Sequence, residues 1–145
     1  LLTGGGNLSA DRTFDIPKGT TANYRAKTND TGALTTKQVW DAVAEVALTD
    51  GATITPDFAT GLDFSVTLGG NRTLANPTNV VVGQKGRIRV IQDGTGTRTL
   101  AYGSNFKWAG GTVGVLSTAA STTDFLDYDV VTATHIRVAL SKAWA

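Results

Sequence analysis

Apolar and polar residues alternate along several short segments in the C-terminal part of the chain. Residues 62–68 carry an apolar side chain at every second position, and Ile88 and Val90 alternate with arginines. A period of two is typical of a β-strand with one buried face. From about residue 52 onward we therefore expect short, half-buried strands.

Glycine-rich turns separate these strands and indicate which of them pair. A turn at residues 69–71 would fold the first strand back into residues 72–74. The strand of Val90 is expected to pair with residues 100–102 so that Val90 faces Leu100, because this register keeps one face apolar.

Residues 126–131 and 135–140 form the clearest pair, a hairpin around residues 132–134. The facing pairs in that register are Val130 and Ile136, Tyr128 and Val138, Leu126 and Leu140, and Asp129 and Arg137. A slip of one residue would place Val130 against Arg137 and lose these matches. The pattern therefore predicts both the hairpin and its register.

One amphipathic helix is predicted, over residues 36–47. Thr35 and Gln38 have the spacing of a capping box. Its apolar stripe consists of Val39, Trp40, Val43, Val46 and Ala47. A helix of this length is marginal alone, so the stripe must pack against either the β domain or the same helix in neighbouring chains.

The apolar residues of residues 1–34 are spaced too widely to form a core of their own. This segment is either a disordered terminus or an extended arm that packs against other copies of the chain. We expect three parts: an arm over residues 1–34, a short helix and linker over 35–50, and a distal domain over 51–145. The fold class is mainly β, with a small antiparallel β-sandwich or jelly-roll-like domain after the arm and helix.

Composition narrows the function classes. The chain has 41% hydrophobic residues, 17% charged residues and a net charge of +1. We therefore expect it to fold, and its charge does not favour binding to nucleic acid or to an anionic membrane. No apolar stretch is long enough to insert into a membrane. The absence of cysteine excludes disulfides and thiolate chemistry. Methionine is also absent, so we expect a processed chain or a fragment of a longer protein.

Candidate catalytic and metal-binding groups are few. His135 is the only histidine and is expected in solvent at a strand end. Asp124, Asp127 and Asp129 suggest a calcium site or a pair of catalytic acids, but strand alternation places Asp124 on the opposite face from the other two. Asp129 also faces Arg137. We therefore predict no catalytic residue, no metal site and no cofactor.

Residues 102–111 combine aromatic and polar side chains in a glycine-bounded loop. Aromatic rings can stack on the C–H face of a sugar while amide and ammonium groups bond its hydroxyls. The candidate glycan-binding residues are Asn105, Lys107 and Trp108. Alternatively, these rings cap the open end of the sandwich and serve only in packing.

Several segments resemble bacteriophage tail fibres and other virion appendage proteins. Residues 2–14 (LTGGGNLSADRTF) are similar to a segment common in such proteins. The segments that resemble the linker and the C-terminal β domain of phage and prophage tail proteins are residues 24–26, 34–42, 71–79, 92–96 and 103–108.

The resemblance implies a homotrimeric, non-enzymatic virion fibre that is assembled in the bacterial cytoplasm and associates with other tail or baseplate proteins. Its distal domain would attach to the host surface and adsorb surface polysaccharide. The helix residues Val39, Trp40, Val43 and Val46 would then form the oligomer interface. Three alternatives stay open: a head fibre or capsid decoration protein, a monomeric carbohydrate-binding module of a secreted bacterial protein, and a depolymerase.

Overall fold

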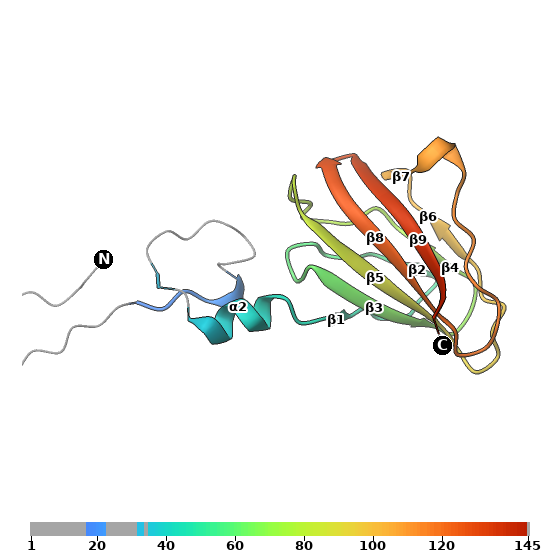
Figure 1. The fold of residues 1–145 in the computed structure, drawn as a ribbon, viewed down its shortest axis with the longest axis horizontal. Helices are drawn as coiled ribbons and strands as arrows, with labels where there is room; N and C mark the ends of the chain where they lie inside the picture. The colour runs from blue at the N-terminus through green and yellow to red at the C-terminus, as the bar shows by residue number, and fades with distance from the viewer. Residues whose placement is uncertain (1–16, 23–31, 34, 145) are drawn as a thin grey trace, which may run out of the picture. The chain divides into compact units, whose positions relative to one another are not determined.

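The computed structural model describes residues 17–22, 32–33 and 35–144. The chain divides into two compact units, Leu1–Val43 and Ala44–Ala145, whose elements are drawn in Figure 1. Each unit is described by itself. Most of the arm predicted over residues 1–34 lies outside the described residues. Within its described part, Lys18 pairs with Ala33 in an isolated parallel bridge.

Helix α2, Thr36–Ala42, begins at the predicted capping box. The Thr35 backbone N–H donates to Gln38 Oε1 over 2.8 Å, and the Gln38 N–H donates to Thr35 Oγ1 over 3.3 Å. The capping box is thus confirmed, but the helix ends at Ala42 rather than at Ala47. On this shorter helix and its C-cap the exposed apolar residues are Val39, Trp40 and Val43.

The second unit contains two sheets. Its strands are β1 (Val46–Ala47), β2 (Thr53–Ile54), β3 (Asp63–Leu68), β4 (Arg72–Leu74), β5 (Lys85–Gln92), β6 (Leu100–Tyr102), β7 (Phe106–Trp108), β8 (Thr123–Thr132) and β9 (His135–Trp144), with a 3₁₀ turn η1 at Ala109–Gly111. One sheet has the strand order β1-β3-β5-β8-β9-β7, and the other has the order β2-β4-β6. The prediction of a mainly β fold with a short helix is confirmed.

Strands β1 to β6 alternate between the two sheets, and within each sheet these strands are parallel. Val46 pairs with Phe64, and Thr53 pairs with Thr73, so the chain returns beside itself after about 20 residues. The pairing is therefore mixed, with antiparallel neighbours only where β8 meets β5 and β9 among the described strands.

This crossing between sheets makes two predicted pairings wrong. Strand β4 does not fold back onto β3; it pairs with β2 and β6 in the other sheet. Val90 pairs with Val66 and Asp124, whereas Leu100 pairs with Arg72. The physical reason is that the apolar faces of β5 and β6 meet across the core rather than side by side, since both strands contribute to one buried cluster.

Residues 46 and 47 form the edge strand β1 instead of the last helical turn. The Val46 side chain packs against the core, and a Cβ on Gly61 would lie only 2.7 Å from Val46 Cγ2. Leu48 extends the pairing by donating its N–H to the Ser65 carbonyl over 2.8 Å. Pairing with β3 gives β-branched Val46 a half-buried position, which outweighs the helical periodicity of the sequence.

The C-terminal hairpin is confirmed in the predicted register. Leu126 pairs with Leu140, Tyr128 with Val138, and Val130 with Ile136, and Asp129 faces Arg137. The apolar members of these pairs face the core, which also takes the Phe58 ring stacked 4.5 Å from the Tyr128 ring. The alternation in residues 62–68 is confirmed as well, because Phe64, Val66 and Leu68 are all buried.

Candidate functional site

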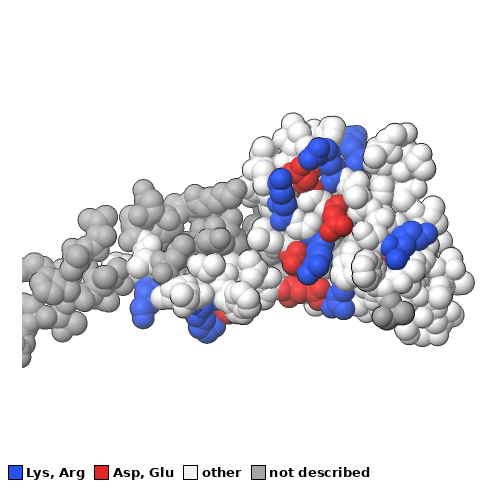
Figure 2. Space-filling model, viewed as in Figure 1, with Lys and Arg blue, Asp and Glu red and all other residues white. Residues whose placement is uncertain are grey.

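The outward face of the six-stranded sheet is built from the residues that alternate with the core positions. One row across the strands holds Lys85, Asp129, Arg137 and Lys107, and the next holds Asp63, Arg87 and Asp127. Basic and acidic side chains are interspersed on the face shown in Figure 2. This face therefore offers donors and acceptors of both charges in close register.

A groove of about 510 Å³ lies on this face where β7, β8 and β9 meet. The outward side chains that supply its chemistry are Lys107, Asp127, Asp129, His135 and Arg137. Trp108 borders the groove from the core side of the sheet, in register with buried Val138. Strand β7 runs parallel to β9, with Lys107 opposite Arg137 and Trp108 opposite Val138. The groove thus joins the aromatic segment to the hairpin, two regions about 30 residues apart in the chain.

Two of the three predicted glycan-binding residues, Lys107 and Trp108, line this groove. Asn105 does not line it. The Asn105 backbone N–H donates to Asn76 Oδ1 over 2.8 Å, and its side-chain amide donates to the Ala133 carbonyl over 3.4 Å. Asn105 therefore ties two loops together.

Trp108 has both a packing contact and a groove position. Its half-buried ring meets the Tyr102 ring edge-on, with centroids 4.9 Å apart. A Cβ on Gly114 would lie 2.5 Å from Trp108 Cζ3, so Gly114 makes room for the indole. Trp108 is in register with buried Val138 and packs against the core, so its indole supports the groove from beneath the sheet.

Most charged groups of the groove already have partners. Arg137 donates to Asp129, and this guanidinium lowers the pKa of the Asp129 carboxyl below its ordinary value. Lys107 Nζ donates to the Ser104 carbonyl over 2.7 Å. Asp127 is different: it is the only carboxylate among residues 17–22, 32–33 and 35–144 with no hydrogen bond or ion pair, and it is exposed.

From the sequence, Asp127 was considered as a possible calcium ligand or catalytic acid, not as a glycan-binding residue. Strand alternation did place Asp127 and Asp129 on one face, as observed. What the sequence could not show is that Lys107 lies beside them, because β7 joins β9 through a long-range parallel pairing.

The remaining acidic candidate, Asp124, lies on the inward face and is buried. Its carboxylate accepts hydrogen bonds from the Ser117 N–H and Oγ and from the Ala143 N–H, at 2.6, 2.7 and 2.8 Å. Within the described parts of the chain, no three His, Asp or Glu side chains are placed to hold a metal ion. The helices described there are also too short or too polar to cross a membrane.

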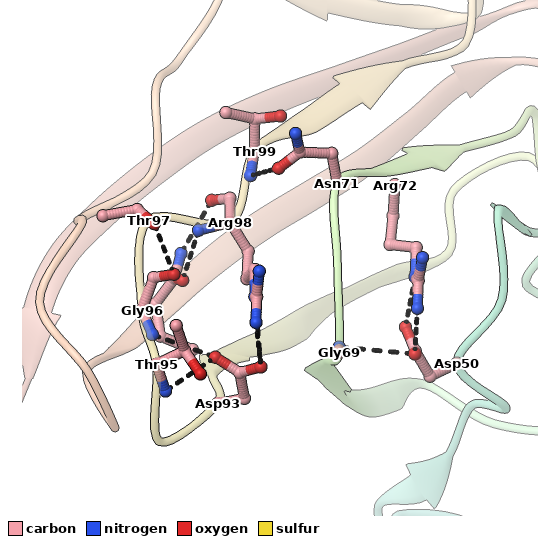
Figure 3. Close-up of polar contacts among 11 residues, drawn as sticks. Asp50, Gly69, Asn71, Arg72, Asp93, Thr95, Gly96, Thr97, Arg98 and Thr99 are labelled. Carbon is pink, nitrogen blue, oxygen red and sulfur yellow. Dashed lines mark hydrogen bonds and ion pairs between the residues drawn. The ribbon is translucent and has the colours of Figure 1, made fainter.

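Polar contacts at one end of the strands have a structural role (Figure 3). Arg72 binds Asp50 through two hydrogen bonds of 2.8 and 2.6 Å, and Arg98 binds Asp93 over 3.1 and 2.8 Å. Each arginine lowers the pKa of its carboxyl partner. Asn71 Oδ1 accepts from the Thr99 N–H over 3.0 Å, which joins two loops of neighbouring strands.

Comparison with known proteins identifies the family. Residues 54–127 match the family described as "Putative phage tail fibre C-terminal domain", and these residues include the last residue of β2, all of β3 to β7 and part of β8. No curated protein and no solved structure matches the chain. The match covers half of the chain, so the protein belongs to the phage tail fibre C-terminal domain family and has a structural role in the virion.

Proposed function

We propose that this domain attaches a homotrimeric tail fibre to the bacterial host and that its outward groove adsorbs surface glycan. The observation that supports the proposal is the meeting of Lys107 and the unpaired Asp127 in one groove. Sugar sites bind hydroxyls through a few fixed polar groups. Here Lys107 donates hydrogen bonds to hydroxyls and Asp127 accepts them.

The arrangement favours binding over hydrolysis. A glycosidase needs two converging carboxyls, one of them with a raised pKa so that it can act as the acid. In this groove Asp129 is occupied by Arg137, which lowers its pKa. The groove therefore supports adsorption without cleavage.

The trimeric state is proposed from the first unit. Val39, Trp40 and Val43 are 39%, 78% and 43% exposed on or next to a seven-residue helix. Three such helices around a common axis would bury this stripe. Val46 was assigned to the same interface, but it packs against the core of the second unit and is left out of the proposal.

Size-exclusion chromatography with light scattering tests the trimer. A mass of about 45 kDa, three times 15.1 kDa, is expected for wild type, and the variant Trp40→Ala should lower it. A wild-type mass near 15.1 kDa would contradict the trimer and favour a monomeric carbohydrate-binding module.

Adsorption to host cells tests the groove. Lys107→Ala and Asp127→Ala should each weaken adsorption about tenfold, because each removes a charged hydrogen-bonding group. Lys85→Ala is the matched control, since Lys85 lies on the same face but does not line the groove. Unchanged adsorption in both groove variants would contradict the proposal. Trp108→Ala adds a readout of folding, because Trp108 also packs against Tyr102.

A further inference from the structure

A second groove lies on the same outward face, farther along β8 and β9. It has a volume of about 280 Å³ and is lined by Arg87, Phe125, Asp127, Ser141 and Trp144. Asp127 lines both this groove and the first one. The two grooves therefore adjoin at the carboxylate that has no partner within the described residues.

The second groove has an aromatic wall. The Phe125 and Trp144 rings meet edge-on with centroids 6.3 Å apart, and the Arg87 guanidinium lies 5.4 Å from the Phe125 ring centroid. Trp144 is 59% exposed. An indole held by a ring contact on one side and open on the other is suited to stacking against an apolar ligand face.

The two grooves together are too long for one sugar ring. Lys107 is opposite Arg137 in β9, and Trp144 ends the same strand. Residues of a β-strand are about 3.3 Å apart, so these positions are separated by roughly 20 Å. Asp127, opposite Ala139, lies between these two positions. A ligand that contacts both Lys107 and Trp144 must therefore be a chain of several units.

The charges of the two grooves indicate what kind of chain fits. Counted once each, the Lys, Arg and Asp side chains of the two grooves are Lys107, Arg137, Arg87, Asp127 and Asp129, three basic against two acidic groups. Because Arg137 is already bound to Asp129, such a lining gives little attraction for a polyanion. The unpaired carboxylate accepts hydrogen bonds from hydroxyls and repels acidic groups.

We propose that Trp144 forms a second subsite and that the ligand is an extended, uncharged oligosaccharide running along β8 and β9. This inference rests on the proposed adsorption function. Lys107 and Trp144 contact separate sugar units, and Asp127 binds hydroxyls between them. Longer chains therefore bind more tightly than short ones until both subsites are filled.

The test begins with an array of purified bacterial surface polysaccharides, both neutral and acidic, probed with the full chain. Size-fractionated fragments of the polysaccharide that binds are then titrated by calorimetry. Wild type should bind long fragments about tenfold more tightly than short ones. Trp144→Ala should remove this gain and leave the affinity for short fragments unchanged, whereas Lys107→Ala should weaken both.

Val115→Ala is the control, because Val115 is 71% exposed and lies outside both grooves. Thermal melting and solution mass are measured for each variant. Binding without a dependence on length, or with a gain that survives Trp144→Ala, would overturn the second subsite and leave the first groove standing. Selective binding of acidic chains would overturn the uncharged ligand. A changed solution mass for Trp144→Ala with unchanged binding would make Trp144 an interface residue instead.

Absence of binding to any polysaccharide on the array would contradict the adsorption function itself. Whether the wild-type protein binds any polysaccharide therefore distinguishes failure of the adsorption function from failure of the second subsite.

Discussion

The β8–β9 hairpin and the parallel strands β1 to β6 reach their register in different ways. In the hairpin, the facing residues are close in sequence, and the chain reverses between Thr132 and His135. In the parallel strands, neighbours such as Asp63 and Arg87 are separated by a crossing through the other sheet. Local side-chain pairs are enough to specify the hairpin. The parallel arrangement also needs contacts that stabilise the segments connecting one sheet to the other.

Buried amides supply those contacts. Gln84 Nε2 donates to the Phe58 and Gly61 carbonyls over 3.2 and 3.0 Å. Gln92 Nε2 donates to the Arg98 and Ser117 carbonyls, both over 2.9 Å. These side chains satisfy backbone groups that no strand neighbour reaches. Buried polar groups of this kind fix a single arrangement, because every alternative leaves a buried group unsatisfied.

The largest predicted effect comes from a close approach of parallel strands. A Cβ on Gly86 would lie 1.9 Å from the Leu62 carbonyl oxygen and 2.8 Å from the Tyr128 hydroxyl oxygen. Gly86→Ala is expected to destabilise the domain by about 3 kcal/mol or more, measured by urea unfolding. Gly94→Ala is the control, because a Cβ there meets nothing within 4 Å. Equal stability of the two variants would contradict the observed packing of β5.

A smaller loss is expected when a buried amide is replaced. Gln84→Leu keeps a side chain of similar size but leaves the Phe58 and Gly61 carbonyls without their donor. We expect a loss of about 2 kcal/mol in the free energy of unfolding. Amide hydrogen exchange should also quicken in residues 58–62. A loss below about 0.5 kcal/mol would show that water replaces the amide and that it does not hold the crossing.

Acid should weaken the ion pairs of Arg72 with Asp50 and of Arg98 with Asp93. Arg72 and Arg98 lower the pKa values of Asp50 and Asp93 in the folded state. The unfolded chain therefore binds more protons as the pH falls from about 5 to about 2, and the stabilisation present above this range is lost. The Asp50→Asn and Asp93→Asn double variant should show a flatter dependence of melting temperature on pH. Asp127→Asn removes no hydrogen bond or ion pair, and a similar flattening there would contradict the assignment.

The smallest effect is predicted in the hairpin. Arg137→Ala removes the exposed pair with Asp129, but the apolar pairs still specify the register. Exposed ion pairs contribute little, so the melting temperature should fall by about 2 °C or less. Nuclear Overhauser contacts between Val130 and Ile136 should persist. Loss of these contacts would show that the ion pair, rather than the apolar face, sets the register.

The elements that could be predicted are those whose evidence is local. The capping box of Thr35 and Gln38 and the pairing of Val130 with Ile136 depend on residues only a few positions apart. The helix end was not predictable in the same way, because Val46 fits a helical stripe in the sequence and an edge strand in the fold. Pairing with β3 places Val46 in a strand and not in the helix.

The candidate site likewise has features that local sequence predicts and features that depend on the fold. Lys107 and Trp108 stood out by residue type, and alternation placed Asp127 and Asp129 on one face. Their meeting in one groove depends on β7 lying beside β9.

The sequence by itself determined which face of each strand is buried and how the last two strands pair. Only the tertiary structure decided that β5 and β6 lie in different sheets and that β7 completes the groove. The physical reason is that burial is non-directional. A strand gains similar free energy by burying its apolar face beside another strand or across the core from it. Which of these arrangements forms is therefore decided by the packing of the whole core and by the hydrogen bonds of buried polar side chains.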